Sequence, residues 1–258
     1  MLINTPGYYG PGVEENPVLE KLLAAACSYP HDDDSFINGR LERYLCRDAL
    51  PIPLCLTLIE FINRSKLVPV GTTGLPDNES IGSYRTTVYS EQLARNIDAL
   101  VYWGVRERLF AKHSHDSKIY CSPVFRMMRY GAGGGHGIHH DAPYIESTTK
   151  RTHYSWVLYL NDVEEGGRTF FVNKTWDGYD DRLSHSLELV ERDGQLMTSD
   201  GLYQVTDALV PTMGSMAVFE HRLPHGVEKF NGPGYRYVIR GDFFLEGEYD
   251  EAGNPIKK

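Results

Sequence analysis

Hydrophobic and polar positions follow different periods in the two parts of the chain. Up to about residue 120, apolar side chains recur at helical spacing in three segments, which we expect to be helices: residues 17–27, 53–64 and 90–110. The third begins at Ser90, a residue type that caps helix N-termini, and carries Leu93 and Ile97 on one stripe. The pattern therefore predicts a helical N-terminal region.

From residue 123 onward, short apolar runs are broken by Gly, Asn and Asp, a pattern typical of an antiparallel sandwich or barrel. Long loops in compact domains are usually functional or have structure of their own, and the polar stretch 173–210 exceeds a hairpin loop. It is either a lid over a site or a dimer or partner surface; Trp176, Tyr179 and Tyr203 would contact substrate in the first case. The candidate strands are 124–130, 154–160, 168–172, 216–220 and 235–245.

Composition excludes several classes of protein. A chain of 258 residues, 41% hydrophobic and 24% charged, fits a soluble globular protein with one domain and insertions. A net charge of -9 disfavours a nucleic-acid partner. Four cysteines without a CxxC pair indicate a reduced chain, and neither a secretory signal nor a long apolar run is visible. We expect a cytoplasmic protein without a membrane partner, and its oligomeric state stays open.

One segment concentrates metal-binding side chains. Residues 130–141 read YGAGGGHGIHHD, and on a strand His139 and Asp141 would project to the same face. A lone His-x-Asp pair is weak evidence, so a third ligand is needed. His221 and His225 both follow an apolar strand downstream, and spacing alone does not choose between them. Two histidines and one carboxylate make up the facial triad of non-haem Fe(II) oxygenases.

Three ordered motifs resemble the prolyl 4-hydroxylase-like branch of the Fe(II)/2-oxoglutarate-dependent dioxygenases. The first is the family's Tyr-x2-Gly-x5-His-x-Asp, matched by Tyr130, Gly133, His139 and Asp141. The second lies within 159–171, where Tyr-Leu-Asn is followed by Glu-Glu-Gly-Gly and Thr-Phe-Phe. The third comprises Pro211, Gly214, an apolar strand at 216–219, His225, Gly226, Gly234, Arg236, Arg240 and Asp242.

This resemblance implies a mainly β fold with N-terminal helices. Its core would be a double-stranded β-helix, or jelly roll, at residues 121–258, buttressed by the helical region 1–120. Residues 1–258 would then form a single oxygenase domain, with an insert at about 173–210.

The resemblance also assigns roles to residues. It implies Fe(II) on His139, Asp141 and His225, which selects His225 over His221. Arg236 would pair with the distal carboxylate of 2-oxoglutarate, a task suited to the planar guanidinium group. Hydroxyl groups to the same cosubstrate would come from Tyr130, Tyr159 and Thr169, for which ordinary strand packing is the alternative. His136 and His140 are expected to be loop histidines rather than ligands.

The implied activity is hydroxylation of an amino acid, free or peptidyl and proline-like by analogy. It would consume 2-oxoglutarate and O2, release succinate and CO2, and use ascorbate as reductant. Asp141 occupies the position where halogenating relatives carry a small residue, which favours oxygenation. The alternatives are an oxygenase acting on another small carboxylate-bearing metabolite in a biosynthetic pathway, and a catalytically silent binding module of the same fold.

Strand alternation suggests residues that select the substrate. If Tyr130 faces the cavity, so does Arg126, and Arg240 shares a face with Arg236. A buried arginine needs an anionic partner, so we predict that Arg126, Arg240 or both bind a substrate carboxylate or a nearby acid. Arg85 is a further substrate candidate, with a surface loop as its alternative. For Arg240 the alternative is a structural ion pair with Asp162, Glu164 or Asp242.

Overall fold

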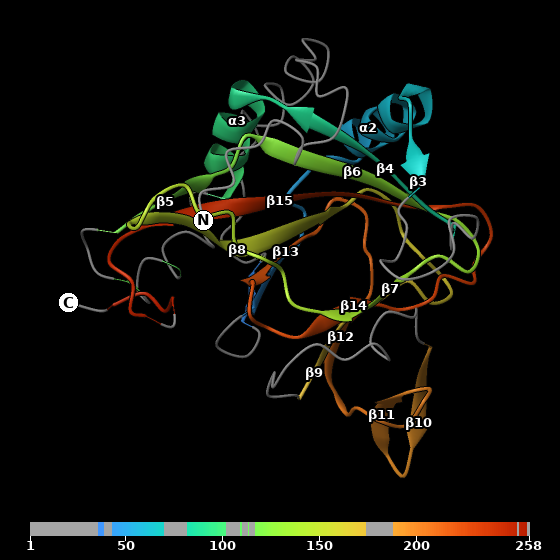
Figure 1. Ribbon diagram of the computed structural model, residues 1–258. Helices are drawn as coiled ribbons and strands as arrows, with labels where there is room; N and C mark the ends of the chain where they lie inside the picture. Colours follow the sequence, from blue (N-terminus) through green and yellow to red (C-terminus); the bar gives the residue numbers. More distant parts are fainter. Residues whose placement is uncertain are drawn as a thin grey trace.

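The computed structural model describes residues 36–38, 43–69, 82–101, 109, 113, 117–173, 188–251 and 253–256. Two β-sheets face each other, and helices α2 and α3 cover the outer side of the larger sheet (Figure 1). This is the mainly β, jelly-roll architecture that the sequence predicted. The helix predicted at 17–27 lies outside the described residues.

The larger sheet has nine strands, and every neighbouring pair is antiparallel. Its order is β1-β2-β13-β8-β15-β6-β4-β3, with β5 paired to β15. The strands are β1 Phe36–Asn38, β2 Arg43–Cys46, β3 Val68–Pro69, β4 Ser83–Tyr89, β5 Lys118–Cys121, β6 Val124–Tyr130, β8 Lys150–Tyr159, β13 Met216–Glu220 and β15 Arg236–Glu246.

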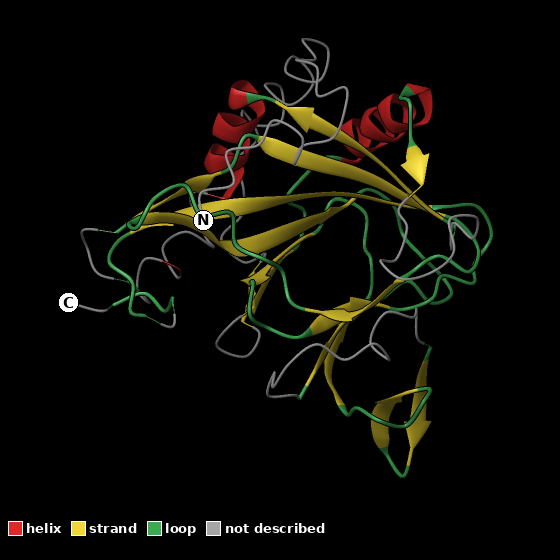
Figure 2. Cartoon of the chain, in the orientation of Figure 1, coloured by secondary structure: helices red, strands yellow, loops and turns green. Residues whose placement is uncertain are grey.

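The smaller sheet holds four strands in the order β12-β9-β14-β7. They are β7 His136–His139, β9 Thr169–Val172, β12 Val205–Leu209 and β14 His225–Val227. A separate hairpin of β10 Leu189–Arg192 and β11 Gln195–Thr198 projects away from the two sheets (Figure 2).

Alternation along the strands divides the core into two layers. On β6, Met127 packs toward the helices, whereas Met128 packs between the sheets with Phe171 and Phe219. This register turns Arg126 and Tyr130 toward the space between the sheets, as the sequence predicted.

Both described helices follow their sequence patterns. Helix α2, Ile52–Arg64, buries residues at helical spacing, among them Leu54, Leu58 and Ile62. Helix α3, Glu91–Val101, begins after Ser90, whose hydroxyl accepts a hydrogen bond from the backbone N–H of Leu93 at 3.0 Å. The predicted N-cap is therefore confirmed. Neither helix is long and apolar enough to cross a membrane.

The N-terminal region contains strands that the helical prediction missed. Strand β4 pairs with β6, and β2 pairs with β13, so both extend the larger sheet. The β4 sequence SYRTTVY is rich in β-branched and aromatic residues, which favour a strand over the predicted surface loop.

Part of the predicted insert also belongs to the fold, because β12 pairs with β9 in the smaller sheet. Tyr203 forms backbone hydrogen bonds with Thr198 inside this segment and does not line the cavity described below. Trp176 and Tyr179 lie outside the described residues.

Candidate metal and cosubstrate site

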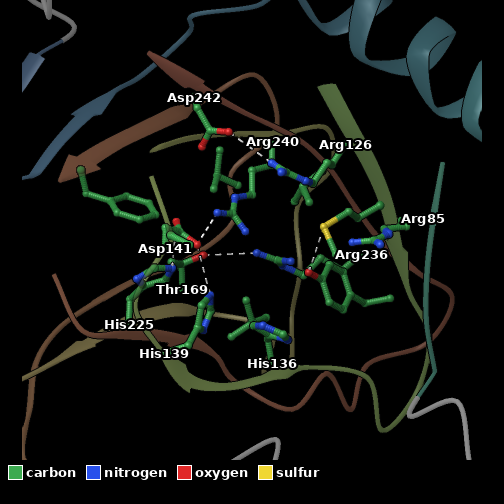
Figure 3. Close-up of a pocket in the computed structure, with 17 residues that line it drawn as sticks. Arg85, Arg126, His136, His139, Asp141, Thr169, His225, Arg236, Arg240 and Asp242 are labelled. Carbon is green, nitrogen blue, oxygen red and sulfur yellow. Dashed lines mark hydrogen bonds and ion pairs between the residues drawn. The ribbon is translucent and has the colours of Figure 1, made fainter. Parts of the chain in front are cut away.

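Two histidines and one aspartate converge at one end of the smaller sheet (Figure 3). His139 ends β7, Asp141 follows two residues later, and His225 opens β14. Their potential ligand atoms all lie within 4.8 Å of one another. The Nε2 atoms of His139 and His225 lie 3.5 and 3.6 Å from the two carboxylate oxygens of Asp141.

The outer nitrogen of each histidine is held by the backbone. Nδ1 of His139 donates to the carbonyl oxygen of Gly137, and Nδ1 of His225 donates to that of Leu223, both at 2.8 Å. A carbonyl oxygen can only accept, so these bonds place the proton on Nδ1 and leave the Nε2 lone pair directed at the cluster. Burial lowers the pKa of His225 to about 3, which keeps this ring neutral. The arrangement suits a divalent metal.

Asp141 is buried, and each of its two carboxylate oxygens has a partner. It forms an ion pair with Arg240 and accepts a hydrogen bond from the Ser155 hydroxyl at 2.5 Å. Burial raises its pKa, but the charge of Arg240 outweighs this, and the pKa lies well below its usual range. The direct ion pair of Arg240 is therefore with Asp141, and Asp242, one of the acids that the sequence suggested, acts on Arg240 only at longer range.

His221 lies apart from the cluster. Its Nε2 is 3.3 Å from Oδ1 of Asp242. The other carboxylate oxygen, Oδ2, accepts a hydrogen bond from Nη1 of Arg126 at 3.2 Å. His225, not His221, is thus the histidine that meets His139 and Asp141.

A cavity of about 250 Å³ opens beside the cluster, between the two sheets. Six of the seven side chains predicted to bind substrate or cosubstrate line it: Arg85, Arg126, Tyr130, Thr169, Arg236 and Arg240. The seventh, Tyr159, is fully buried and does not line the cavity. The cavity thus joins the metal-binding cluster to a strongly cationic wall.

Arg236 lies at the inner end of this wall and is only 1% exposed. Its Nη2 donates to the Thr169 hydroxyl at 3.2 Å, and its guanidinium carbon lies 4.8 Å from the ring centroid of Tyr130. Nε and Nη1 have no hydrogen-bond partner in the part of the chain that the structure describes. Burying a cation without a counter-ion is costly, so this position is built to receive an anion.

Residues 125–243, which contain the whole cluster and Arg236, match the family model of the 2OG-Fe(II) oxygenase superfamily. This region of the chain is a domain of that superfamily. It is therefore the domain of a 2-oxoglutarate-dependent oxygenase, from a family whose members use Fe(II) and 2-oxoglutarate. No curated protein matches the chain.

Solved structures resemble the oxygenase in fold at low sequence identity. The epimerase SnoN from nogalamycin biosynthesis is 14% identical over 89% of this chain and 84% of its own, with a TM-score of 0.51. HygX from Streptomyces hygroscopicus, solved with nickel, 2-oxoglutarate and hygromycin B, is 11% identical over 84% and 86%, with a TM-score of 0.51. A viral collagen prolyl hydroxylase from Paramecium Bursaria Chlorella virus-1 is 15% identical over 79% and 96%, with a TM-score of 0.48.

Beside the oxygenase's cavity, Tyr159, Thr169 and Arg236 form a short chain of hydrogen bonds. Tyr159 donates to the Thr169 hydroxyl oxygen at 2.8 Å, and Arg236 donates to the same atom. Because this oxygen accepts two bonds, its own proton is available to a ligand in the cavity. Tyr130 lines the cavity and donates to the sulfur of Met128 at 3.4 Å. Tyr159 thus orients Thr169 without reaching the cavity itself.

Sequence reasoning missed Ser155, named Asp242 only as a motif residue and a possible partner of Arg240, and placed His136 in a loop. Ser155 and Asp242 are direct partners across β8 and β15, and both contact groups around Asp141. His136 was expected in a loop but begins β7, where its ring meets that of His139 with centroids 4.2 Å apart. Ser155 carries no motif, so only the pairing of β8 with β15 reveals it.

Proposed function

We propose that this oxygenase is an Fe(II)- and 2-oxoglutarate-dependent hydroxylase of an amino acid, free or within a peptide. The observation that carries the proposal is the placement, in one cavity, of a His-Asp-His cluster and of the Arg236 guanidinium, whose Nε and Nη1 have no partner among the described residues. A metal-binding set and a separate carboxylate-binding group are what a chelating dicarboxylate cosubstrate requires.

In this proposal, Fe(II) binds to His139, Asp141 and His225. The donor set fits, because the carboxylate is ionised and both imidazoles direct a lone pair at the cluster. When bound, Fe(II) and 2-oxoglutarate supply the oxidation, in which O2 is consumed, succinate and CO2 are released, and one oxygen atom enters the substrate. Ser155 and Arg240 hold the Asp141 carboxylate in orientation through their contacts with it.

The far carboxylate of 2-oxoglutarate would bind to Arg236 and the Thr169 hydroxyl. Arg236 offers two buried donors, Nε and Nη1, and Thr169 offers its free proton. Tyr159 fixes the orientation of Thr169, and the ring of Tyr130 covers the guanidinium group. These groups position the cosubstrate and exclude water from its inner end.

Proline is the leading target side chain, on the basis of the motif resemblance. Ascorbate would keep the metal reduced between turnovers. The second candidate is oxygenation of another small carboxylate-bearing metabolite, and it differs from the first only in the molecule that the cavity accepts. A silent binding module of the same fold would bind the cosubstrate without converting it.

Succinate formation tests the proposal. The purified protein is incubated with Fe(II), 2-oxoglutarate, ascorbate and O2 in the presence of amino acids, peptides and small carboxylates in turn. We expect succinate release, stimulated by the substrate, and a mass gain of one oxygen atom in an amino acid or peptide. His139→Ala should abolish both signals. Failure to release succinate with any compound would favour the silent module, and oxygen gain in a compound of another class would favour the second candidate.

A further inference from the structure

Two arginines meet on the cavity wall beside the candidate metal site. Arg126 on β6 and Arg240 on β15 are direct partners in the antiparallel register. Both side chains line the cavity and are 24% and 22% exposed (Figure 3). Like charges placed opposite each other on neighbouring strands are destabilising unless anions compensate them. The number of anionic groups beside the two arginines therefore indicates whether the cavity must accept a further anion.

Two carboxylates lie against this pair. Asp141 contacts Arg240, and Asp242 accepts one hydrogen bond from Arg126. Asp242 is ionised, because His221, Arg126 and Arg240 lower its pKa to about 2 even though burial raises it. Among the described residues, Arg126 forms a hydrogen bond and ion pair with Asp242 alone, through Nη1. The rest of its planar group is available for a two-pronged bond to a carboxylate.

Once the proposed metal and cosubstrate are counted, the charges of the groups around the cavity balance only in part. This count rests on the proposed function. Two positive charges on Fe(II) and one on Arg236 cancel the charge of Asp141 and the two carboxylates of 2-oxoglutarate. Arg126 and Arg240 then face Asp242 alone. His139 and His225 add no charge, because each ring donates from Nδ1 to a backbone carbonyl oxygen and turns the lone pair of Nε2 toward the cluster. The wall keeps one positive charge in excess, before Arg85 is considered.

We propose that Arg126 and Arg240 bind a carboxylate of the substrate, and that Arg126 determines specificity for it. A substrate that fills the cavity displaces the water around these side chains, so an uncharged group at this position would leave a cation buried without a counter-ion. The α-carboxylate of a free amino acid meets the requirement. A residue inside a peptide, whose carboxyl group is an amide, does not.

Matched substrates and matched variants test this inference. Each amino acid is supplied as the free acid, as its carboxamide and as the central residue of a capped tripeptide, with succinate and oxygenated product measured. We expect at least one free acid to be hydroxylated, and its amide and tripeptide to react at least about tenfold less efficiently. Arg126→Gln should raise the KM for the acid by about ten- to hundredfold and change the KM for 2-oxoglutarate little.

Arg129→Gln is the matched control. Arg129 lies on the same strand but points to the other face, where it contacts Asn63 and the rings of Tyr84 and Tyr235. It should leave the KM for the acid unchanged. Equal reactivity of acid and amide, a capped tripeptide as the best substrate, or an equal effect of Arg126→Gln on both KM values would overturn the inference.

Melting temperatures, measured by thermal shift, test the inference without requiring turnover. With Mn(II) and 2-oxoglutarate present, at least one free acid should raise the melting temperature of the wild type more than its amide does. Arg126→Gln should remove the difference, and Arg129→Gln should keep it. If no acid exceeds its amide in the wild type, the inference is wrong. Succinate formation is scored separately, so failure of the proposed hydroxylase activity would be recognised independently.

Discussion

His139 and His225 face each other directly across the β7–β14 pair, with their ring centroids 4.4 Å apart. The strands are far apart in sequence, and their antiparallel register alone brings the two rings together. Asp141 joins them because the chain leaves β7 toward the loop after β13, where the Asp141 backbone N–H donates to the carbonyl oxygen of His221 at 3.0 Å. The cluster is therefore positioned by backbone pairing as much as by side-chain contacts.

Variants of the two downstream histidines distinguish the candidate ligand, His225, from its neighbour His221. His225→Ala should abolish tight binding of Fe(II) or Mn(II), measured by calorimetry, because it leaves only His139 and Asp141. His221→Gln should retain metal binding, since His221 contacts Asp242 instead of the cluster. Equal losses in both variants would contradict the assignment of His225.

Arg236→Met should weaken binding of 2-oxoglutarate. The variant removes the buried guanidinium at the inner end of the cavity while keeping an unbranched side chain. We expect the KM for 2-oxoglutarate to rise by at least about tenfold, the range for loss of a charge-assisted bond. Metal affinity, measured without cosubstrate, should stay unchanged, and a matching loss of metal affinity would indicate structural damage.

Gly226 lies directly after His225 in a position too tight for any side chain. A Cβ atom there would come within 2.6 Å of Cζ of Phe170. Gly226→Ala should lower the free energy of unfolding by about 1–3 kcal/mol in denaturant melts, the range for overpacking a core. Phe170→Leu should recover part of the loss. Gly247→Ala, whose Cβ would meet only the Ser117 hydroxyl at 3.6 Å, should be nearly neutral.

The metal-free protein should lose stability as the pH falls from 6.5 toward 3. The unfolded chain takes up a proton at His225 near 6.5, whereas burial in the folded protein lowers that pKa to about 3. The unfolded state thus binds more protons in this window, which favours unfolding by up to about 1.4 kcal/mol per pH unit. His225→Asn should flatten the dependence of chelator-treated protein in denaturant melts. An unchanged slope would show that the ring already titrates normally.

An ion pair between the partly exposed Arg168 and the buried Glu228 holds the hairpin segment against the smaller sheet. Glu228 accepts two hydrogen bonds from the Arg168 side chain, both at 2.7 Å, and one from the backbone N–H of Leu189 at 3.2 Å. Arg168→Met should destabilise the fold by about 3 kcal/mol, because it leaves a buried carboxylate without its cation. Lys229→Met, which breaks an exposed pair with Glu188, should cost less than about 1 kcal/mol.

Local pattern was enough to predict much of the framework. The strands expected at 124–130 and 216–220 coincide with β6 and β13, and the helix expected at 53–64 differs from α2 by one residue. These segments have one apolar face each, so their period is visible in the sequence. The spacing of the Tyr-Gly-His-Asp motif likewise identified residues that the fold brings together.

Relations between distant strands could not be predicted in the same way. The ion pair of Arg240 with Asp141, and the pairing of Ser155 with Asp242, depend on the register of β15 against β8 and on the course of the chain after β7. A strand's own pattern says which face is buried but not which strand lies beside it. For the same reason β4 and β12 were not recognised as members of the two sheets.

The candidate ligands and the cationic wall belong to different sheets. His139 and His225 lie on strands of the smaller sheet, whereas Arg126, Arg236 and Arg240 lie on strands of the larger one. A molecule of 2-oxoglutarate that reached from the metal to Arg236 would link the two sheets reversibly. Cosubstrate binding should therefore slow amide hydrogen exchange in both sheets at once, and the open end of the sandwich would stiffen before any substrate arrives.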